Sequence, residues 1–271
     1  MPEGDSVHRA ARRLQAVLAG KTLTAVEGSH PAVGEAARRL VGDRVRTVEA
    51  IGKHLVLTTE GGWALRTHLG MTGRWRTYEP GQRWSTTPGK ARLVLRSRSA
   101  VAVCFAAPTV EISRASVVRT GLESLGPDLV VADPPVDVIV DRSRVAGAAT
   151  VADLLLDQTV ASGIGNVFKS EILFLERIDP STPPEALADS DVARLYRRGH
   201  RLLSANAGLL RDRTTTGAHR EAYWVYGRGG RPCRRCGTPI VSDVHGTHDR
   251  VTYRCPSCQS STTIDRSFSK G

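Results

Sequence analysis

Apolar residues near the N-terminus recur at intervals of three and four, as on one face of a helix. The residues on this face are Val7, Ala10, Ala11, Leu14, Val17 and Leu18. Gly20 follows as a C-terminal stop, and Asp5 or Ser6 is expected to cap the first turn. The pattern predicts a helix whose positive end, with its free N–H groups, lies at the start of the chain and favours an anion.

After residue 21 the apolar period shortens to two, the alternation typical of strands. Short runs rich in β-branched residues are separated by Gly, Pro and Ser, and Glu60-Gly61-Gly62 has the composition of a hairpin turn. We expect strands at residues 22–27, 44–50, 54–59, 63–68, 74–78, 92–96 and 101–105. Such short, closely spaced strands favour an antiparallel β-sandwich or barrel. With the first helix they form a predicted domain of residues 1–125.

A linker and a helical region follow this domain. Gly126-Pro127 and residues 130–135 have linker composition, and apolar residues then return to helical spacing. We expect helices near residues 151–158, 167–175 and 193–210, in a domain of residues 126–225. The tail, residues 226–271, has too few apolar residues for a core of its own. The predicted fold class is α+β and multidomain: a helix with an antiparallel β-sandwich, a helical domain and a small C-terminal module.

Four cysteines define that module. Two residues separate Cys233 from Cys236, and two residues separate Cys255 from Cys258. Eighteen residues lie between the two pairs. Two such pairs are typical of a zinc ribbon with four thiolate ligands and no open coordination position. One structural Zn²⁺ is therefore the expected cofactor, and its binding would supply folding free energy that the tail lacks. Cys104 lies in an apolar run and is expected in the core.

Composition and charge narrow the class of function. The 271 residues carry 38 Lys+Arg and 27 Asp+Glu, a formal net charge of +11, with a sequence pI near 10.0. A basic chain favours a nucleic-acid partner, although an arginine-rich proteome would give the same excess. No apolar run approaches the ~20 residues of a membrane helix, and the acidic N-terminus is unlike a signal peptide. We expect a cytoplasmic protein with no membrane partner.

Two further segments suit phosphate binding. Residues 157–166 join two predicted helices through Gly163 and Gly165, which permit positive φ and the close approach of a ligand. Asn166 begins the next helix, where its amide and the first N–H groups suit a phosphate; an ordinary helix–turn–helix link with an Asn cap is the alternative. Arg250 lies near the tip of the predicted ribbon, where it suits bidentate phosphate binding or is a solvated surface charge.

The N-terminus itself has nucleophilic potential. Once Met1 is removed, Pro2 exposes a secondary amine with an expected pKa of about 8, the α-amino reference. Attack of this amine on C1′ of a sugar gives an iminium, which activates the neighbouring carbon for elimination. Glu3 can then act as a general acid or base. Taken alone, Pro-Glu at this position also occurs for processing reasons, and Lys53 is an ordinary surface lysine.

Together these segments resemble the formamidopyrimidine-DNA glycosylase and endonuclease VIII family, over nearly the whole chain and in family order. The matching segments are Met1-Pro2-Glu3-Gly4, Gly52-Lys53, His68-Leu69-Gly70-Met71-Thr72-Gly73, Leu125-Gly126-Pro127, the helix–two-turn–helix motif Gly163-Ile164-Gly165-Asn166, Val225-Tyr226-Gly227-Arg228, and the ribbon with Arg250. The resemblance implies a bifunctional DNA glycosylase and abasic-site lyase, which flips a damaged base out of the duplex, excises it and cleaves the strand by β,δ-elimination.

The resemblance also assigns roles to single residues. It implies that Pro2 is the nucleophile that forms the Schiff base, that Glu3 is the general acid and base, and that Lys53 belongs to the catalytic group. Phosphates around the flipped nucleotide would be contacted by Lys53, His68, Asn166 and Arg250. Met71 would fill the void left in the duplex. The expected partner is damaged double-stranded DNA, with bubble or single-stranded DNA left open, bound by a monomer associated with the nucleoid.

The chain also departs from the family pattern. The formamidopyrimidine branch has an Arg-x-Phe wedge, which residues 104–111 lack, and a long lesion-capping loop, whereas the span from Leu210 to Val225 is short. Both differences favour an endonuclease VIII type of enzyme and oxidised pyrimidines as substrates. Ser6 replaces the family's second N-terminal acid, and Asp249 replaces the glycine before the finger arginine.

Two other functions remain open at this point. A catalytically idle protein that binds damaged DNA would retain the DNA contacts and have lost turnover, with Ser6 and the missing wedge as its support. An RNA- or ribosome-associated protein is the third hypothesis, because related helix–turn–helix elements occur in such proteins. The third hypothesis leaves the joint presence of Pro2-Glu3 and the zinc ribbon unexplained.

Overall fold

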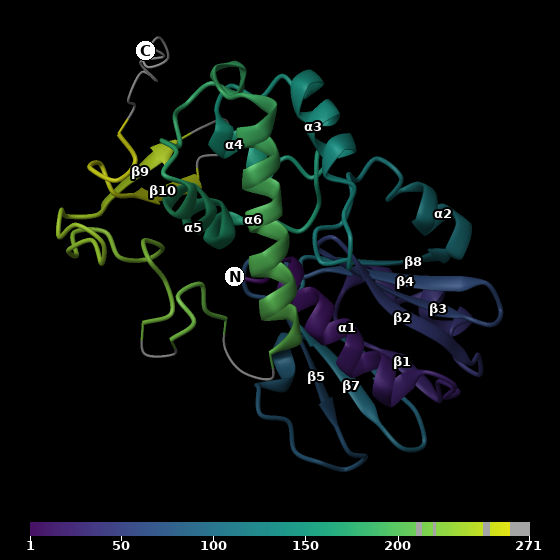
Figure 1. The fold of residues 1–271 in the computed structure, drawn as a ribbon. Helices are drawn as coiled ribbons and strands as arrows, with labels where there is room; N and C mark the ends of the chain where they lie inside the picture. The colour runs from purple at the N-terminus through teal and green to yellow at the C-terminus, as the bar shows by residue number, and fades with distance from the viewer. Residues whose placement is uncertain (210–212, 219–220, 246–249, 261–271) are drawn as a thin grey trace, which may run out of the picture.

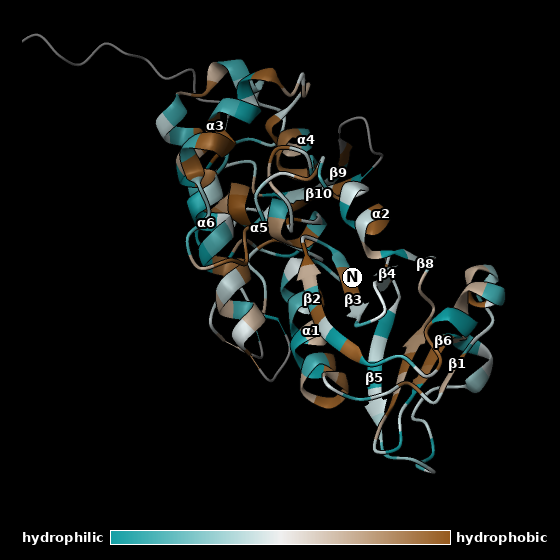
Figure 2. Cartoon of the chain, turned by 90° about the vertical axis from the view of Figure 1, so that its right-hand side faces the viewer, coloured by the Kyte–Doolittle hydropathy of each residue, from teal (hydrophilic) through white to brown (hydrophobic). Residues whose placement is uncertain are grey.

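A computed structural model describes residues 1–209, 213–218, 221–245 and 250–260 of the chain. The chain folds into two parts, a β-sandwich with the first helix and a group of helices that carries a C-terminal β-hairpin (Figure 1). The N-terminus lies where the two parts meet (Figures 1 and 2). The predicted fold class, a sandwich followed by a helical domain and a ribbon, is confirmed.

The first helix, α1 (Gly4–Leu18), packs on the sandwich through the apolar face that the sequence predicts. The residues it buries there are Val7, Ala11, Leu14 and Leu18. Its N-cap is Glu3, not Asp5 or Ser6 as expected, although Ser6 takes part in the capping box as the N3 residue. The Ser6 hydroxyl lies inside the first turn, accepting a hydrogen bond from the Glu3 N–H and donating one to the Glu3 carbonyl, both at 3.0 Å.

Two four-stranded antiparallel sheets enclose the N-terminal core. One sheet has the strand order β2 (Val45–Ile51), β3 (His54–Thr59), β4 (Trp63–His68) and β8 (Thr109–Arg114). The other has the order β1 (Ala25–Glu27), β6 (Ala91–Arg96), β7 (Val101–Phe105) and β5 (Arg74–Tyr78). Leucines of both sheets meet in one cluster with Cys104, which is fully buried as expected.

Strand β8 and the following helix α2 (Ala115–Thr120) are absent from the sequence prediction. The β8 segment alternates, but with only two apolar residues, Val110 and Ile112, so its pattern is too short to identify a strand. The strand pairs with β4 along its whole length, from Trp63 opposite Arg114 to His68 opposite Thr109. This pairing stabilises a strand that the local sequence pattern does not identify.

The second part contains α3 (Val136–Val145), α4 (Val151–Leu156), α5 (Asn166–Glu176) and α6 (Asp189–Gly208). Helix α5 begins at Asn166 as predicted, whereas α4 ends before Gln158 and α3 is unpredicted because it directly follows the Pro-rich linker. Helices α3 and α6 alternate between hydrophobic and hydrophilic residues along their length (Figure 2). Short 3₁₀ turns lie at Pro31–Val33, Glu35–Arg39, Pro88–Lys90 and Pro184–Ala186.

The C-terminal hairpin pairs β9 (Val241–His245) with β10 (Arg250–Arg254). Its small apolar cluster contains Val225 and Ile240, and also Phe174 from α5. The tail therefore completes its core with a residue of the helical domain. Within the part of the chain that the structure describes, no helix is long and apolar enough to span a bilayer.

Candidate active site and metal centre

The carboxylate of Glu3 lies at the N-terminus of α5. Its Oε2 accepts hydrogen bonds from the N–H groups of Gly165 (2.9 Å) and Phe168 (3.3 Å), and its Oε1 accepts one from Val167 (2.8 Å). Glu3 is fully buried. The first N–H groups of α5, which have no partner within the helix, and its positive dipole end thus stabilise the negative charge of a residue near the start of the chain.

Glycines make this contact sterically possible. A Cβ at Gly165 would lie 2.5 Å from the carboxyl carbon of Glu3, and a Cβ at Gly4 would lie 2.9 Å from the Cα of Gly163. Gly163 has φ +115°, a conformation that favours glycine. The sequence predicts that a ligand approaches the backbone of this turn closely. In the structure, Glu3 and the first turn of α1 make that close approach.

Lys53 lies on the turn between β2 and β3, directed toward the same region. Gly52 has φ +58°, its N–H donates to Oδ2 of Asp128 at 2.7 Å, and a Cβ there would lie 2.7 Å from Cβ of Ser162. The pKa of Lys53 is lowered to about 8, mainly by burial; Glu3 opposes this shift, and the charge of Arg250 adds to it. The turn thus holds a lysine that is only partly protonated slightly above neutral pH.

His68 and Met71 follow at the end of β4. Nδ1 of His68 accepts a hydrogen bond from the Gly70 N–H at 3.3 Å. Burial and the neighbouring charges of Lys53 and Arg66 lower the pKa of His68, so the neutral imidazole is favoured. Met71 is 64% exposed, a large apolar side chain directed into solvent at the edge of the site.

Asn166 is held inside the protein. Its Nδ2 donates to the carbonyl of Val251 at 2.8 Å, and its Oδ1 accepts from the ammonium of Lys169 at 2.7 Å. Lys169 also donates to Oγ1 of Thr252 at 2.6 Å and is 1% exposed. Helix α5 is thereby tied to β10. Contact of the Asn166 side chain with a phosphate stays a prediction.

Arg250 is the first residue of β10 and is exposed. Asp249, the residue before it, lies outside the described residues, as does Leu210. One cavity of about 260 Å³ brings the predicted residues together. Its lining includes Pro2, Glu3, Lys53, His68, Met71, Asn166 and Arg250. Segments from the N-terminus, the sandwich, α5 and the ribbon thus converge on one place, although they are far apart in sequence.

Sequence reasoning misses Arg213 and its partner Asp5. The Arg213 guanidinium makes a bidentate contact with the buried Asp5 carboxylate, with Nε to Oδ2 at 2.9 Å and Nη2 on Oδ1. Its centre lies 4.9 Å from the ring centroid of Phe168. Arg213 lines a second cavity of about 790 Å³ that also reaches Met1 and Pro2. No local spacing links positions 5 and 213, so the pair has no sequence signal.

Asp128 is a second residue that the motifs do not reveal. Besides the Gly52 N–H, its Oδ2 contacts Nε2 of His8 on α1 at 2.8 Å. Its Oδ1 accepts from the Val130 N–H at 2.8 Å. One carboxylate of the segment between the two parts therefore fixes both α1 and the Lys53 turn.

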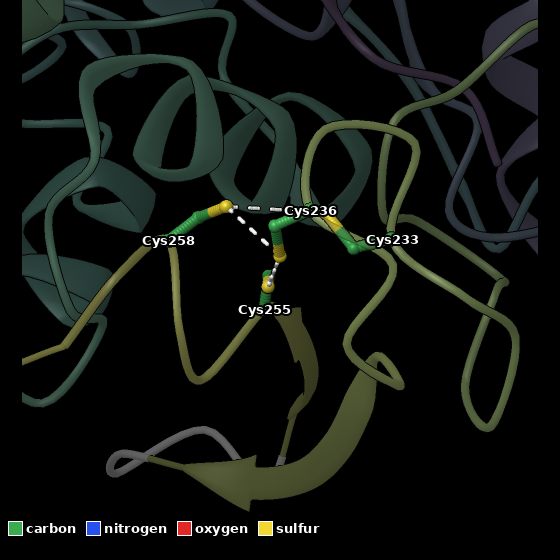
Figure 3. Close-up of side chains that lie close together, drawn as sticks. All are labelled: Cys233, Cys236, Cys255 and Cys258. Carbon is green, nitrogen blue, oxygen red and sulfur yellow. Dashed lines mark hydrogen bonds between the residues drawn. The ribbon is translucent and has the colours of Figure 1, made fainter.

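The four ribbon cysteines form a compact cluster. Their Sγ atoms all lie within 4.8 Å of one another, and Figure 3 shows them directed toward a common centre from the two cysteine turns. The Sγ atoms of Cys236 and Cys255 are 3.5 Å apart, and those of Cys233 and Cys258 are 4.0 Å apart. A tetrahedral zinc with Zn–S bonds of ~2.3 Å requires sulfur separations of about 3.8 Å. The thiolate set therefore fits one structural metal ion.

Comparison with known proteins gives two domain matches. Residues 1–109 match the family model of the formamidopyrimidine-DNA glycosylase N-terminal domain, and residues 125–217 match that of the formamidopyrimidine-DNA glycosylase H2TH domain. The chain is 40% identical over 265 residues to the probable endonuclease 8 2 of Streptomyces coelicolor, covering 96% of this chain and 94% of the relative.

A second relative and a solved structure extend the comparison. The chain is 36% identical over 264 residues to the DNA-(apurinic or apyrimidinic site) lyase Nei2 of Mycolicibacterium smegmatis, covering 97% of this chain and all of the relative. Its fold matches Lactococcus lactis Fpg in complex with DNA containing N7-benzyl-Fapy-dG, with a TM-score of 0.82 and 22% identity over 96% of this chain and 100% of that one.

We predict that Gly165→Ala disrupts the Glu3 contact. The new methyl group would lie 2.5 Å from the Glu3 carboxyl carbon, so either that carboxylate or α5 must move. Chemical denaturation should show a loss of ~1–3 kcal/mol in the free energy of unfolding. Gly208→Ala is the matched control, because nothing lies within 4 Å of its Cβ position. Equal stability of the two variants would contradict the packing described here.

The lowered pKa of Lys53 predicts that affinity for DNA falls as pH rises through about 8. The charged ammonium attracts a phosphate, and its proton is lost at that pH. Binding to a duplex with a reduced abasic site, which cannot form a Schiff base, should weaken between pH 7 and 9. Lys53→Arg, always charged, should remove this dependence. A fall of the same size in Lys53→Arg would assign the titration to another group, with Lys169 the first candidate because burial also lowers its pKa to about 8.

Removal of the metal should unfold the ribbon and spare the sandwich. The hairpin's apolar cluster is small, so thiolate–metal bonds carry much of its stability. After chelation, with metal loss verified by elemental analysis, amide exchange should accelerate in β9 and β10 and stay slow in β2, β3 and β4. DNA binding should be lost. Retained binding by the metal-free chain would show that the ribbon's position does not depend on the metal.

Proposed function

The chain belongs to the formamidopyrimidine-DNA glycosylase and endonuclease VIII family, and we propose that it is a base-excision repair enzyme, a bifunctional DNA glycosylase and abasic-site lyase. The observation that carries the proposal is the single cavity in which Pro2 and Glu3 meet Lys53, His68 and Arg250. The names of the relatives from Streptomyces coelicolor and Mycolicibacterium smegmatis, an endonuclease and an abasic-site lyase, agree with the strand-cleaving part of this activity.

The proposed reaction starts at Pro2, after removal of Met1. The amine attacks C1′ of the flipped nucleotide, a C1′–N bond forms, and the bond to the damaged base breaks with its electron pair leaving on the base, which takes up a proton. Opening of the sugar ring gives an iminium between Pro2 and C1′. Loss of a C2′ proton then expels the 3′ phosphate, and a second elimination expels the 5′ phosphate.

Glu3 suits the proton transfers of this sequence. Its carboxylate is fixed by three N–H groups at the start of α5, one of them from the N-cap Gly165, and Glu3 follows the nucleophile directly in the chain. A fixed group beside the reacting atoms can protonate the departing ring oxygen and later accept a proton without losing its position. The three N–H donors stabilise the negatively charged carboxylate of Glu3 between these transfers.

The remaining residues of the cavity suit contacts to the DNA backbone. Lys53 and Arg250 supply positive charge, and His68 and Asn166 supply polar groups, so we assign them to phosphates around the flipped nucleotide. Met71 is exposed beside them and has the apolar side chain that the vacated position in the duplex requires. The partner proposed is damaged double-stranded DNA, bound by a monomer in the cytoplasm at the nucleoid.

For the substrate we propose oxidised pyrimidines. The connection between β7 and β8 contains only residues 106–108, where Ala107 is buried. A loop this short has no room for an Arg-x-Phe wedge. The span from Leu210 to Val225 lies partly outside the described residues. We assign the chemistry to residues 1–125, DNA binding to residues 126–225, and the finger, with one structural Zn²⁺, to residues 226–271.

Borohydride trapping on abasic DNA tests the proposal. Wild-type protein, shown by intact mass to lack Met1, should form a covalent adduct because borohydride reduces the iminium at Pro2. Pro2→Gly should trap at least tenfold more slowly, since a primary amine on a flexible residue replaces the fixed secondary amine.

The same experiment separates the other hypotheses. Tight binding of abasic duplex DNA without an adduct would favour the catalytically idle binder. In a binding assay, equal affinity for duplex RNA and abasic duplex DNA would favour the RNA-associated protein. Undiminished trapping by Pro2→Gly would exclude Pro2 as the nucleophile.

A further inference from the structure

The Met1–Pro2 peptide bond makes a specific contact with Arg213. Nη1 of Arg213 donates to the carbonyl oxygen of Met1 at 3.3 Å, and the same Nη1 lies 3.9 Å from Oε1 of Glu3. The Arg213 side chain is only 8% exposed. A buried guanidinium is thus directed at the Met1 carbonyl group, whose carbon is bonded to the nitrogen of Pro2.

That atom group has the connectivity of a reaction intermediate. In the unprocessed chain the Pro2 nitrogen is bonded to the Met1 carbonyl carbon, which carries one oxygen and one further carbon, Cα. In the proposed reaction the same nitrogen is bonded to C1′, which carries one oxygen and one further carbon, C2′. The Met1 carbonyl therefore occupies the place that C1′ and its oxygen take after Met1 is removed.

We propose that Arg213 is a further catalytic residue, which donates a hydrogen bond to the oxygen that leaves C1′ as the iminium forms. This inference rests on the proposed function. The oxygen is O4′ when a nucleoside ring opens, and it is the C1′ hydroxyl when the substrate is a preformed abasic site. Arg213 transfers no proton: the C1′–O electron pair moves to the oxygen, the proton comes from Glu3, and the nitrogen lone pair forms the C1′=N bond.

The surroundings of Arg213 hold it in place for this role. Asp5 fixes Nε and Nη2 through its two carboxylate oxygens, which leaves Nη1 for Met1 and Glu3. The ring of Phe168 lies 4.9 Å from the guanidinium centre. A donor fixed before the reaction stabilises developing negative charge without a reorganisation cost.

The contact between Arg213 and Asp5 also relates to the second N-terminal acid of the family, which this chain lacks. Ser6 takes the position of that acid, and its hydroxyl is engaged by the backbone N–H and carbonyl of Glu3. Asp5 beside it is engaged by Arg213. The acid adjacent to Ser6 thus positions a cationic donor, which can assist departure of the oxygen in place of a second carboxyl group.

The test is the rate of borohydride trapping on a preformed abasic duplex at saturating DNA. Arg213→Met alone would leave Asp5 buried without its partner, so the main variant is Asp5→Leu with Arg213→Met, because replacing both charges of a buried pair by apolar side chains often preserves stability. We expect the trapping rate to fall about 10²-fold, the usual effect of losing one fixed donor, with little change in DNA affinity. Arg213→Lys, which keeps a cation, should recover part of the rate.

Arg12→Met is the matched control. Arg12 on α1 donates through Nη2 to the carbonyl of Ala207 near the end of α6, so its loss removes a tie between these helices without touching Met1 or Pro2. Its trapping rate should stay within threefold of wild type. A folded double variant that binds abasic DNA and traps at the wild-type rate would overturn the role of Arg213. If the wild-type protein itself traps nothing, the proposed function fails instead.

Discussion

The docking of Glu3 on the N-terminus of α5 is the contact on which the rest of the site depends. It joins residue 3 to residues 165–168 through three N–H donors and buries the carboxylate completely. A buried carboxylate is costly unless fully hydrogen-bonded, and a helix N-terminus has N–H groups that need acceptors. Each partner satisfies the other, so the relative position of α1 and α5 is set by polar groups that neither part can leave unpaired.

From this contact the other segments are positioned in turn. Asn166, the first residue of α5, binds the carbonyl of Val251, and Lys169 one turn later binds Thr252, so β10 and its Arg250 follow the helix. Asp128 in turn binds Gly52 and His8 and holds the Lys53 turn against α1. The geometry of the cavity is thus a property of the interface between the two parts.

The difference between local patterns and contacts distant in sequence explains what the sequence could and could not predict. Strands 54–59, 63–68, 74–78 and 101–105 were predictable because their apolar alternation is local, and the four cysteines because metal geometry fixes their spacing. Strand β8 depends on its pairing with β4, and the Glu3 cap of α1 is held by a helix more than 160 residues away, so local patterns miss the first and misplace the second. The motif residues were found through a family resemblance. Arg213, Asp128 and Lys169 were not, since each acts through a partner distant in sequence.

The charges in the site also follow from its burial. Lys53, Lys169 and Arg250 lie close enough that Arg250 lowers the pKa of both lysines, while Glu3 provides the opposing charge that the helix N-terminus already stabilises. In the free protein, burial and mutual repulsion therefore work against full protonation of the lysines. A phosphate entering the cavity reverses the sign of the local interaction for each of them. If DNA binds as we propose, its binding is therefore coupled to proton uptake by these lysines.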